Sequence, residues 1–157
     1  MILMIILLIL SSFLDGILQV IFKDVLPLFF LATIVVFSIK NNNKLFYYVI
    51  IFLLGLIYGL SYTSLFFLYA FIYVFIAYIL SFISNKNNYI KLFFTYNLSI
   101  LMYIVLMFIF SFYTNYNLMN IIYLYFKNLP LNYIYFTIMY LFINTLCNNR
   151  NRLNKYS

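Results

Sequence analysis

The sequence predicts an all-α, polytopic integral membrane protein with about six transmembrane helices in a single domain, 1–157. Three observations lead to this prediction. No charged side chain stands between Lys44 and Lys86. Hydrophobic residues make up 68% of the chain and charged residues 7%, which is more apolar surface than a soluble domain of this length can cover. The basic residues gather at the ends of the apolar stretches, where they set the orientation of membrane helices.

The uncharged stretch predicts a helical hairpin. A hydrocarbon core of about 30 Å takes about 20 apolar residues in a helix. The run 64–83 meets that length without interruption, and 45–60 is a shorter companion. Ser61, Tyr62 and Thr63 are left as the turn, so the tip of the hairpin has no charge while both of its ends carry lysine.

Two spans are predicted before this hairpin, over 2–22 and 25–39. Asp15 lies in the later half of the first span, and a net-neutral turn at 23–24 follows it. Pro27 suits the first turn of the second span, where its missing N–H costs little. That span is short, so we expect its ends near the interface or a local mismatch with the bilayer. A polar loop, 40–44, leads into the hairpin.

Two more spans are predicted after the hairpin, over 92–113 and 131–147, with a polar loop at 84–91. The intervening segment, 114–130, mixes asparagine and tyrosine with isoleucine and leucine. We expect this segment to lie along the membrane interface, where tyrosine is favoured. The end of the chain, 148–157, is predicted to be a short basic tail.

The distribution of positive charge predicts that both termini are cytoplasmic. The net charge is +7, and its position at span ends favours orientation and contact with anionic membrane lipid over nucleic acid. With six spans, the outer side receives only two basic residues, Lys23 and Lys127. The inner side receives the other seven, which are Lys40, Lys44, Lys86, Lys91, Arg150, Arg152 and Lys155.

Asp15 and Gln19 are the first candidate functional residues. Asp15 is the only acid inside a predicted span, and a carboxylate at mid-helix costs about 2.5–3.5 kcal/mol to insert. Gln19 lies four residues later on the same helix face, so the pair forms one polar stripe. The stripe is either a contact that holds helices or a partner, or a proton or ion site. The alternative is an aspartate that lies at the interface.

A second candidate is the glycine pair Gly55 and Gly59, in the sequence GLIYG. Glycines four residues apart allow another helix backbone to approach closely. The pattern predicts either internal helix packing or contact with another protein. Asn97 and Asn144 stand within the last two predicted spans, and we expect them to form hydrogen bonds across helices.

The chain offers little for catalysis. It has no histidine and one cysteine, Cys147, which argues against a zinc site made by the protein alone and against a disulfide within the chain. No phosphate-binding glycine loop, nucleophile elbow or paired carboxylate is present. We therefore expect no enzyme activity, no cofactor and no metal.

Several short motifs, in order, resemble the MreD family of cell-shape proteins. An early Leu-Asp-Gly in the first span corresponds to Leu14-Asp15-Gly16, and a proline opening the second span corresponds to Pro27. A Gly-Leu-x-Tyr-acid pattern in the third span corresponds to 55–59, although Gly59 stands where the family usually has an acid. The resemblance covers most of 13–83 and fades after Lys91.

This resemblance implies a scaffold of the cell-wall elongation machinery in the inner membrane of a bacterium. The implied partner is MreC, a single-span protein with a large outer domain, and through it the actin-like MreB and the peptidoglycan synthases. The family fold is similar to the six-helix substrate-binding subunits of energy-coupling factor transporters. The alternative function is therefore a membrane subunit that binds a small, vitamin-type molecule.

Overall fold

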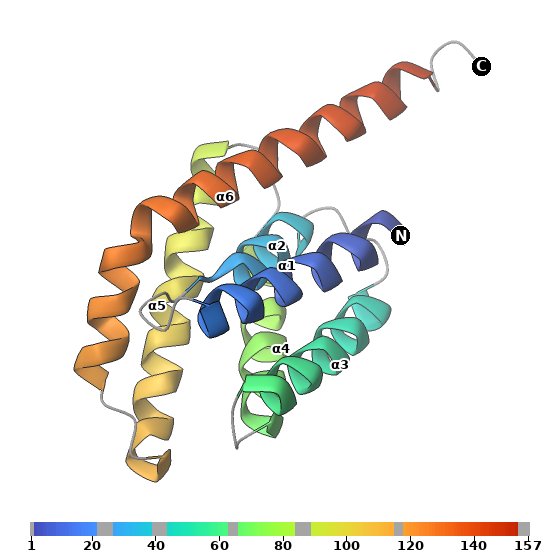
Figure 1. Ribbon diagram of the computed structural model, residues 1–157. Helices are drawn as coiled ribbons and strands as arrows, with labels where there is room; N and C mark the ends of the chain where they lie inside the picture. Colours follow the sequence, from blue (N-terminus) through green and yellow to red (C-terminus); the bar gives the residue numbers. More distant parts are fainter. Residues whose placement is uncertain are drawn as a thin grey trace.

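The computed structural model describes residues 2–21, 27–38, 44–62, 66–83, 89–114 and 118–153. Within these ranges only Pro27 and Leu28 are not helical. The described residues form six α-helices: α1 (Ile2–Ile21), α2 (Phe29–Ser38), α3 (Lys44–Tyr62), α4 (Phe66–Ile83), α5 (Tyr89–Thr114) and α6 (Leu118–Leu153). Figure 1 shows the other helices packed around the short helix α2. The predicted all-α class is confirmed.

Three helices are long and apolar enough to cross a membrane. Their apolar windows are Ile2–Ile21 in α1, Tyr89–Ile109 in α5 and Ile122–Leu146 in α6. The other three helices are apolar but shorter. This set of helices indicates a multi-pass membrane protein.

The central helix α2 differs from the predicted span 25–39. It has 10 residues, which at about 1.5 Å per residue cover only half of a hydrocarbon core. All residues from Phe29 to Phe37 are buried, because α1, α4, α5 and α6 all contact α2. The short helix is therefore enclosed by the other helices, and the expectation about its ends relative to the bilayer stays a prediction.

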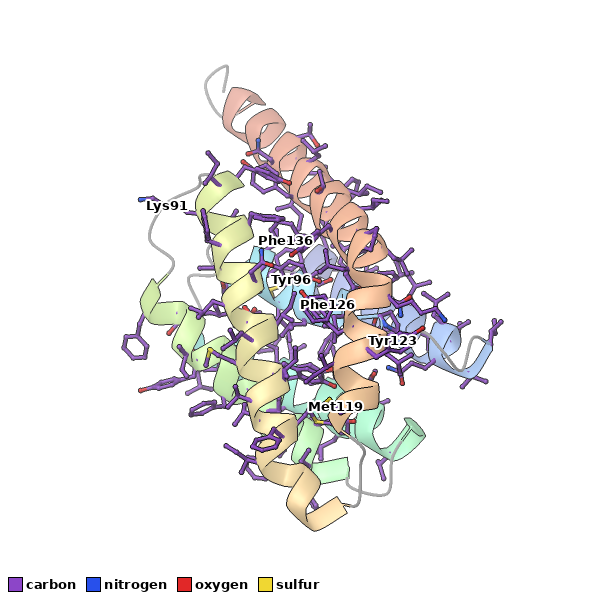
Figure 2. All side chains as sticks on the ribbon, turned by 90° about the vertical axis from the view of Figure 1, so that its left-hand side faces the viewer. Lys91, Tyr96, Met119, Tyr123, Phe126 and Phe136 are labelled. Carbon is purple, nitrogen blue, oxygen red and sulfur yellow. The ribbon has the colours of Figure 1, made fainter. Side chains whose placement is uncertain are left out.

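Large aromatic side chains fill the space around α2. Tyr73 of α4 packs edge-on against Phe30 of α2, with ring centroids 4.8 Å apart. Tyr96 of α5 stacks on Phe136 of α6 at 4.6 Å and an interplanar angle of 4°, and Figure 2 shows these two rings between their helices. All four side chains are fully buried. The core is thus built from rings contributed by α2, α4, α5 and α6.

The last helix also differs from the prediction. The segment 114–130 does not form a separate interfacial segment, because α6 begins at Leu118 and runs through Pro130 as one helix of 36 residues. Within this helix Asn128 forms a local hydrogen bond, in which its Nδ2 donates to the Leu124 carbonyl at 2.8 Å. Proline cannot supply a helical N–H, which accounts for the bend of α6 in Figure 1.

The remaining differences concern ends and turns. The predicted tail, 148–157, is helical as far as Leu153, and the predicted loop 84–91 is shortened because α5 begins at Tyr89. The predicted turn at 23–24 and most of the loops 40–44 and 84–91 lie outside the described residues. The predicted turn 61–63 was wrong for Ser61 and Tyr62, because both belong to helix α3. The helices α3 and α4 lie within about two residues of the predicted spans 45–60 and 64–83.

Candidate functional site

The start of α2 is an irregular piece of backbone inside the protein. Pro27 and Leu28 are buried and not helical, and the Leu28 carbonyl accepts the first helical bond from the Ala32 N–H at 3.0 Å. Leu28 is therefore the N-cap residue, and leucine has no side-chain acceptor for the N–H groups of the first turn. In a membrane such groups must be satisfied by the protein itself.

Asp15 of α1 supplies the missing acceptors. Its Oδ1 accepts the Phe29 N–H at 2.9 Å, and its Oδ2 accepts the Phe30 N–H at 2.8 Å. Asp15 is only 1% exposed. Both oxygens accept, and they lie at the positive end of the α2 dipole, where a negative charge on the carboxyl group is stabilised. Asp15 thus acts as the cap of a different helix.

The magnitudes explain why an acid can stand here. Inserting a carboxylate at mid-helix costs about 2.5–3.5 kcal/mol. A hydrogen bond to a charged group contributes about 1.5–3 kcal/mol, and a charge at a helix end contributes up to about 2 kcal/mol. Two such hydrogen bonds together with the dipole offset the insertion cost, so the contact holds α1 and α2 together.

Asn132 of α6 satisfies a third N–H of the same turn. Its Oδ1 accepts the Leu28 N–H at 2.9 Å, and the side chain is fully buried. Asn132 follows the bend of α6 at Pro130 by two residues. We call these five residues, Asp15, Leu28, Phe29, Phe30 and Asn132, the capped start of α2.

Further contacts surround the capped start of α2. The Tyr96 hydroxyl of α5 donates to the Leu28 carbonyl at 3.5 Å. The Tyr135 ring of α6 stacks on Phe29, with centroids 4.0 Å apart. Thr33 Oγ1 donates to the Phe29 carbonyl at 2.8 Å. Side chains of α1, α5 and α6 therefore meet at the first turn of α2.

Gln19 does not share the partner of Asp15. Its Nε2 donates to the Tyr58 hydroxyl of α3 at 2.6 Å. The polar stripe on α1 therefore holds two helices, since Asp15 contacts α2 and Gln19 contacts α3. Tyr58 is the tyrosine of the GLIYG sequence, so two of the motifs noted in the sequence meet in this contact.

The glycine motif lies at the interface of α3 and α4. A Cβ built on Gly55 would stand 2.7 Å from the Cα of Ala70 and 3.2 Å from its backbone nitrogen. The two backbones are too close for any side chain at that point. Gly59 is also buried. Gly55 therefore serves packing within the chain, in a hairpin whose two helices contact each other extensively.

Asn97 joins α5 to α6. The Tyr133 hydroxyl donates to Asn97 Oδ1, while Asn97 Nδ2 donates to the Phe93 carbonyl at 2.8 Å. This confirms the prediction that Asn97 forms a hydrogen bond across helices. Asn144 is partly buried.

Asn132 was not among the residues singled out from the sequence, and Tyr58 was noted only as part of the GLIYG motif. One signal could have indicated a remote cap: Leu28, which follows Pro27 at the head of a helix, is not a capping residue. A helix start without its own cap must find acceptors elsewhere, and Asp15 is the only acid in a predicted span. No local pattern, however, identifies Asn132 among the asparagines of the chain.

The described hollows are apolar and lie apart from the capped start of α2. One of about 250 Å³ is lined by Phe71, Ile72 and Phe75 of α4 and Leu106 of α5. Another lies along α1 at Ile6, Ile9, Leu10 and Phe13. Among the described residues, no three His, Cys, Asp or Glu side chains form a group that could hold a metal ion. The arrangement is suited to holding helices together.

The chain matches no family model, no curated protein and no solved structure. Its function is therefore argued from the geometry of these contacts and from the residues that resemble the MreD motifs.

Proposed function

We propose that this protein is a non-enzymatic membrane scaffold of the bacterial cell-wall elongation machinery, with both termini cytoplasmic. One observation carries the proposal: the residues that resemble the MreD motifs contact one another or their neighbours inside the helix bundle. Asp15 holds the first turn of α2 just after Pro27. Tyr58 accepts from α1, and Gly55 packs on α4. Such residues hold the helices of this frame, the helix bundle, in a fixed arrangement, which a scaffold requires.

The outer surface of this frame is suited to a transmembrane partner. Large apolar side chains are exposed along the whole length of α1, and those at helical spacing include Ile2, Ile6, Ile9, Phe13, Ile17 and Val20. Within a membrane, another helix can pack its side chains against such a shallow apolar surface. We propose that a single-span protein resembling MreC packs its helix there or in the hollow between α4 and α5, and that peptidoglycan synthases assemble through it.

The packing of α5 against α6 supports one part of the predicted orientation. The start of α5 lies beside the last part of α6, because the Tyr89 ring contacts the Tyr140 ring at 5.1 Å. The last part of α6 and Lys91 therefore lie at one end of the bundle (Figure 2), as the predicted orientation requires.

The transporter alternative receives less support from the described residues. A substrate-binding subunit needs a cavity with several converging polar groups. Both oxygens of Asp15 and the Oδ1 of Asn132 accept backbone N–H groups instead. Most of the segment 114–130, whose Lys127 the charge distribution assigns to the outer side, belongs to helix α6.

Photo-crosslinking in cells of the source organism tests the proposal. A photoreactive amino acid at Phe13 samples the α1 surface, and one at Phe71 samples the hollow between α4 and α5. Leu8, which is fully buried, is the matched internal control. We expect at least one of the two exposed positions, and not Leu8, to crosslink to a single-span membrane protein with a large outer domain.

Affinity capture of the same variants from mild detergent completes the test. Recovery of peptidoglycan synthases with the crosslinked partner supports the scaffold. Recovery of ATPase subunits in its place would establish the transporter alternative. Crosslinks to lipid alone, from both exposed positions, would also overturn the proposal.

A further inference from the structure

The last part of α6 extends past the rest of the bundle. The helix has 36 residues, or about 54 Å, against a hydrocarbon core of about 30 Å. Its apolar window ends at Leu146, but the helix continues to Leu153. Figure 1 shows this part, in red, projecting away from the other helices. We call residues 141–153 the α6 overhang.

Contacts near Tyr140 fix the end of the bundle at which the overhang begins. The Tyr89 hydroxyl of α5 lies 3.1 Å from Thr137 Oγ1, and the Tyr89 and Tyr140 rings are 5.1 Å apart. Since Tyr89 is the first residue of α5, the overhang passes beyond the start of that helix. Figure 2 shows Lys91 at this same end and Met119 near the opposite one.

The overhang is apolar first and basic afterwards. Leu141, Phe142 and Leu146 are between 39% and 55% exposed, so the surface that they present continues the lipid-facing surface of α6. The rest of the overhang contains Arg150 and Arg152, and no acid follows residue 141. Exposed Lys91 adds a further positive charge at the same end.

We propose that the α6 overhang docks on anionic phospholipid headgroups at the membrane surface. Its apolar part remains in the acyl region, while the positive charges of Arg150 and Arg152, which follow it in the sequence, attract the anionic headgroups by about 1 kcal/mol each. Because α6 itself crosses the membrane, Arg150 and Arg152 lie only about 6 and 9 Å along the helix from the end of its apolar window at Leu146. These distances are comparable with the Debye length of about 8–10 Å. The exposed apolar side chains favour a lipid surface over an acidic protein in solution. This inference rests on the membrane span of α6 and is independent of the proposed protein partner.

The single cysteine provides the probe. Cys147 is labelled in detergent with a fluorophore whose emission moves to shorter wavelength in an apolar environment. The full-length protein is then reconstituted in vesicles of phosphatidylcholine alone or with phosphatidylglycerol added. We expect emission at shorter wavelength in the mixed vesicles, and we expect ~1 M salt, at which the Debye length is about 3 Å, to reverse this difference.

Two matched variants separate headgroup binding from a general effect of charge. Each basic residue near an anionic surface strengthens docking roughly fivefold, so Arg150→Gln/Arg152→Gln should lose the phosphatidylglycerol-dependent shift. Lys23→Gln/Lys127→Gln removes the same amount of charge from the opposite predicted side, and this variant should keep the phosphatidylglycerol-dependent shift. Arg150→Lys/Arg152→Lys should retain most of the shift and shows that the site tolerates substitution.

Three outcomes would overturn the proposal. The first is equal emission of the wild type in the two kinds of vesicle. The second is an undiminished shift in the Arg150→Gln/Arg152→Gln variant. The third is a shift that requires added membrane proteins and not phosphatidylglycerol, which would assign the overhang to a protein partner.

Discussion

The Asp15 carboxylate of α1 accepts the backbone N–H of Phe30 at 2.8 Å, in the first turn of α2. The N-cap residue of α2 is a leucine, so the cap that this helix lacks in its own sequence comes from another helix. The same carboxylate also accepts the Phe29 N–H. The acid that the sequence offers as a functional candidate is thereby a link between α1 and the central helix.

Replacing Asp15 should destabilise the protein in a defined order. In Asp15→Asn the amide oxygen still accepts one of the two backbone N–H groups, but the NH₂ group of the amide faces the other N–H and cannot accept from it. In Asp15→Leu both buried N–H groups lose their acceptor, at about 1–3 kcal/mol each. We expect stability to fall from wild type to Asn to Leu, measured by thermal unfolding in detergent, and recovery of the protein partner to follow the same order.

Ser12 provides the control for this series. It is on the same helix, and its hydroxyl donates only to the local Ile9 carbonyl at 3.2 Å, so Ser12→Leu should have little effect. If Asp15 were an ion or proton site, Asn would impair function as much as Leu, because both remove the charge. An Asp15→Leu protein as stable as the wild type would show that the cap contributes nothing.

Asn132 should behave as a second acceptor at the same helix start. Asn132→Leu leaves the buried Leu28 N–H without its acceptor, at about 1–3 kcal/mol. Asn144→Leu, at a partly buried position of the same helix, should cost less. Thermal unfolding of the two variants checks this difference, and equal losses would contradict the assignment of Asn132.

The substitutions at Asp15 and Asn132 should not be additive. Both side chains hold neighbouring N–H groups of one turn, and residues in one network usually couple by about 0.5–3 kcal/mol. A double-mutant cycle with Asp15→Asn and Asn132→Leu measures this coupling. Strict additivity would show that the two side chains act on separate parts of the structure.

Gly55→Ala should destabilise the α3–α4 hairpin. The new methyl group would stand 2.7 Å from the Ala70 Cα, and forcing a methyl group into a packed interface costs about 1–3 kcal/mol. The close atoms belong to the backbone, so Ala70→Gly should not restore stability. Leu53→Ala, at an exposed position of α3, is the control. If Ala70→Gly restored stability, the destabilising contact would be with the Ala70 side chain and not with its backbone.

Cysteine labelling should establish the orientation of the chain. Single cysteines at Lys44, Lys86 or Lys155, in a Cys147→Ser background, should be protected from impermeant thiol reagents in intact cells. They should react once the membrane is permeabilised, because the positive-inside rule assigns these lysines to the cytoplasm.

Cysteines at Thr63 and Asn117 complete the orientation test. These positions belong to the opposite predicted side and should react in intact cells. External labelling of the three lysine positions, with protection of these two, would reverse the proposed topology.

Much of the fold could be predicted from local sequence. The uncharged run between Lys44 and Lys86 predicted α3 and α4 within about two residues, because the length of an apolar run follows the thickness of the bilayer. The same reasoning predicted α1 and α5 to within three residues. The segment 114–130 was misplaced, because an asparagine such as Asn128 looks like a loop residue until its hydrogen-bond partner within α6 is known.

The sequence by itself determined that this chain belongs in a membrane, because hydropathy and charge are properties of each residue wherever it lies. Only the tertiary structure decided that α2 is a buried half-length helix and that Asp15 and Asn132 hold its first turn. The two hydrogen bonds of Asp15 join residues that are 14 and 15 positions apart in the chain, and the hydrogen bond of Asn132 joins residues that are 104 positions apart. Each buried N–H must find an acceptor somewhere in the protein, and which acceptor is within reach depends on how the helices pack.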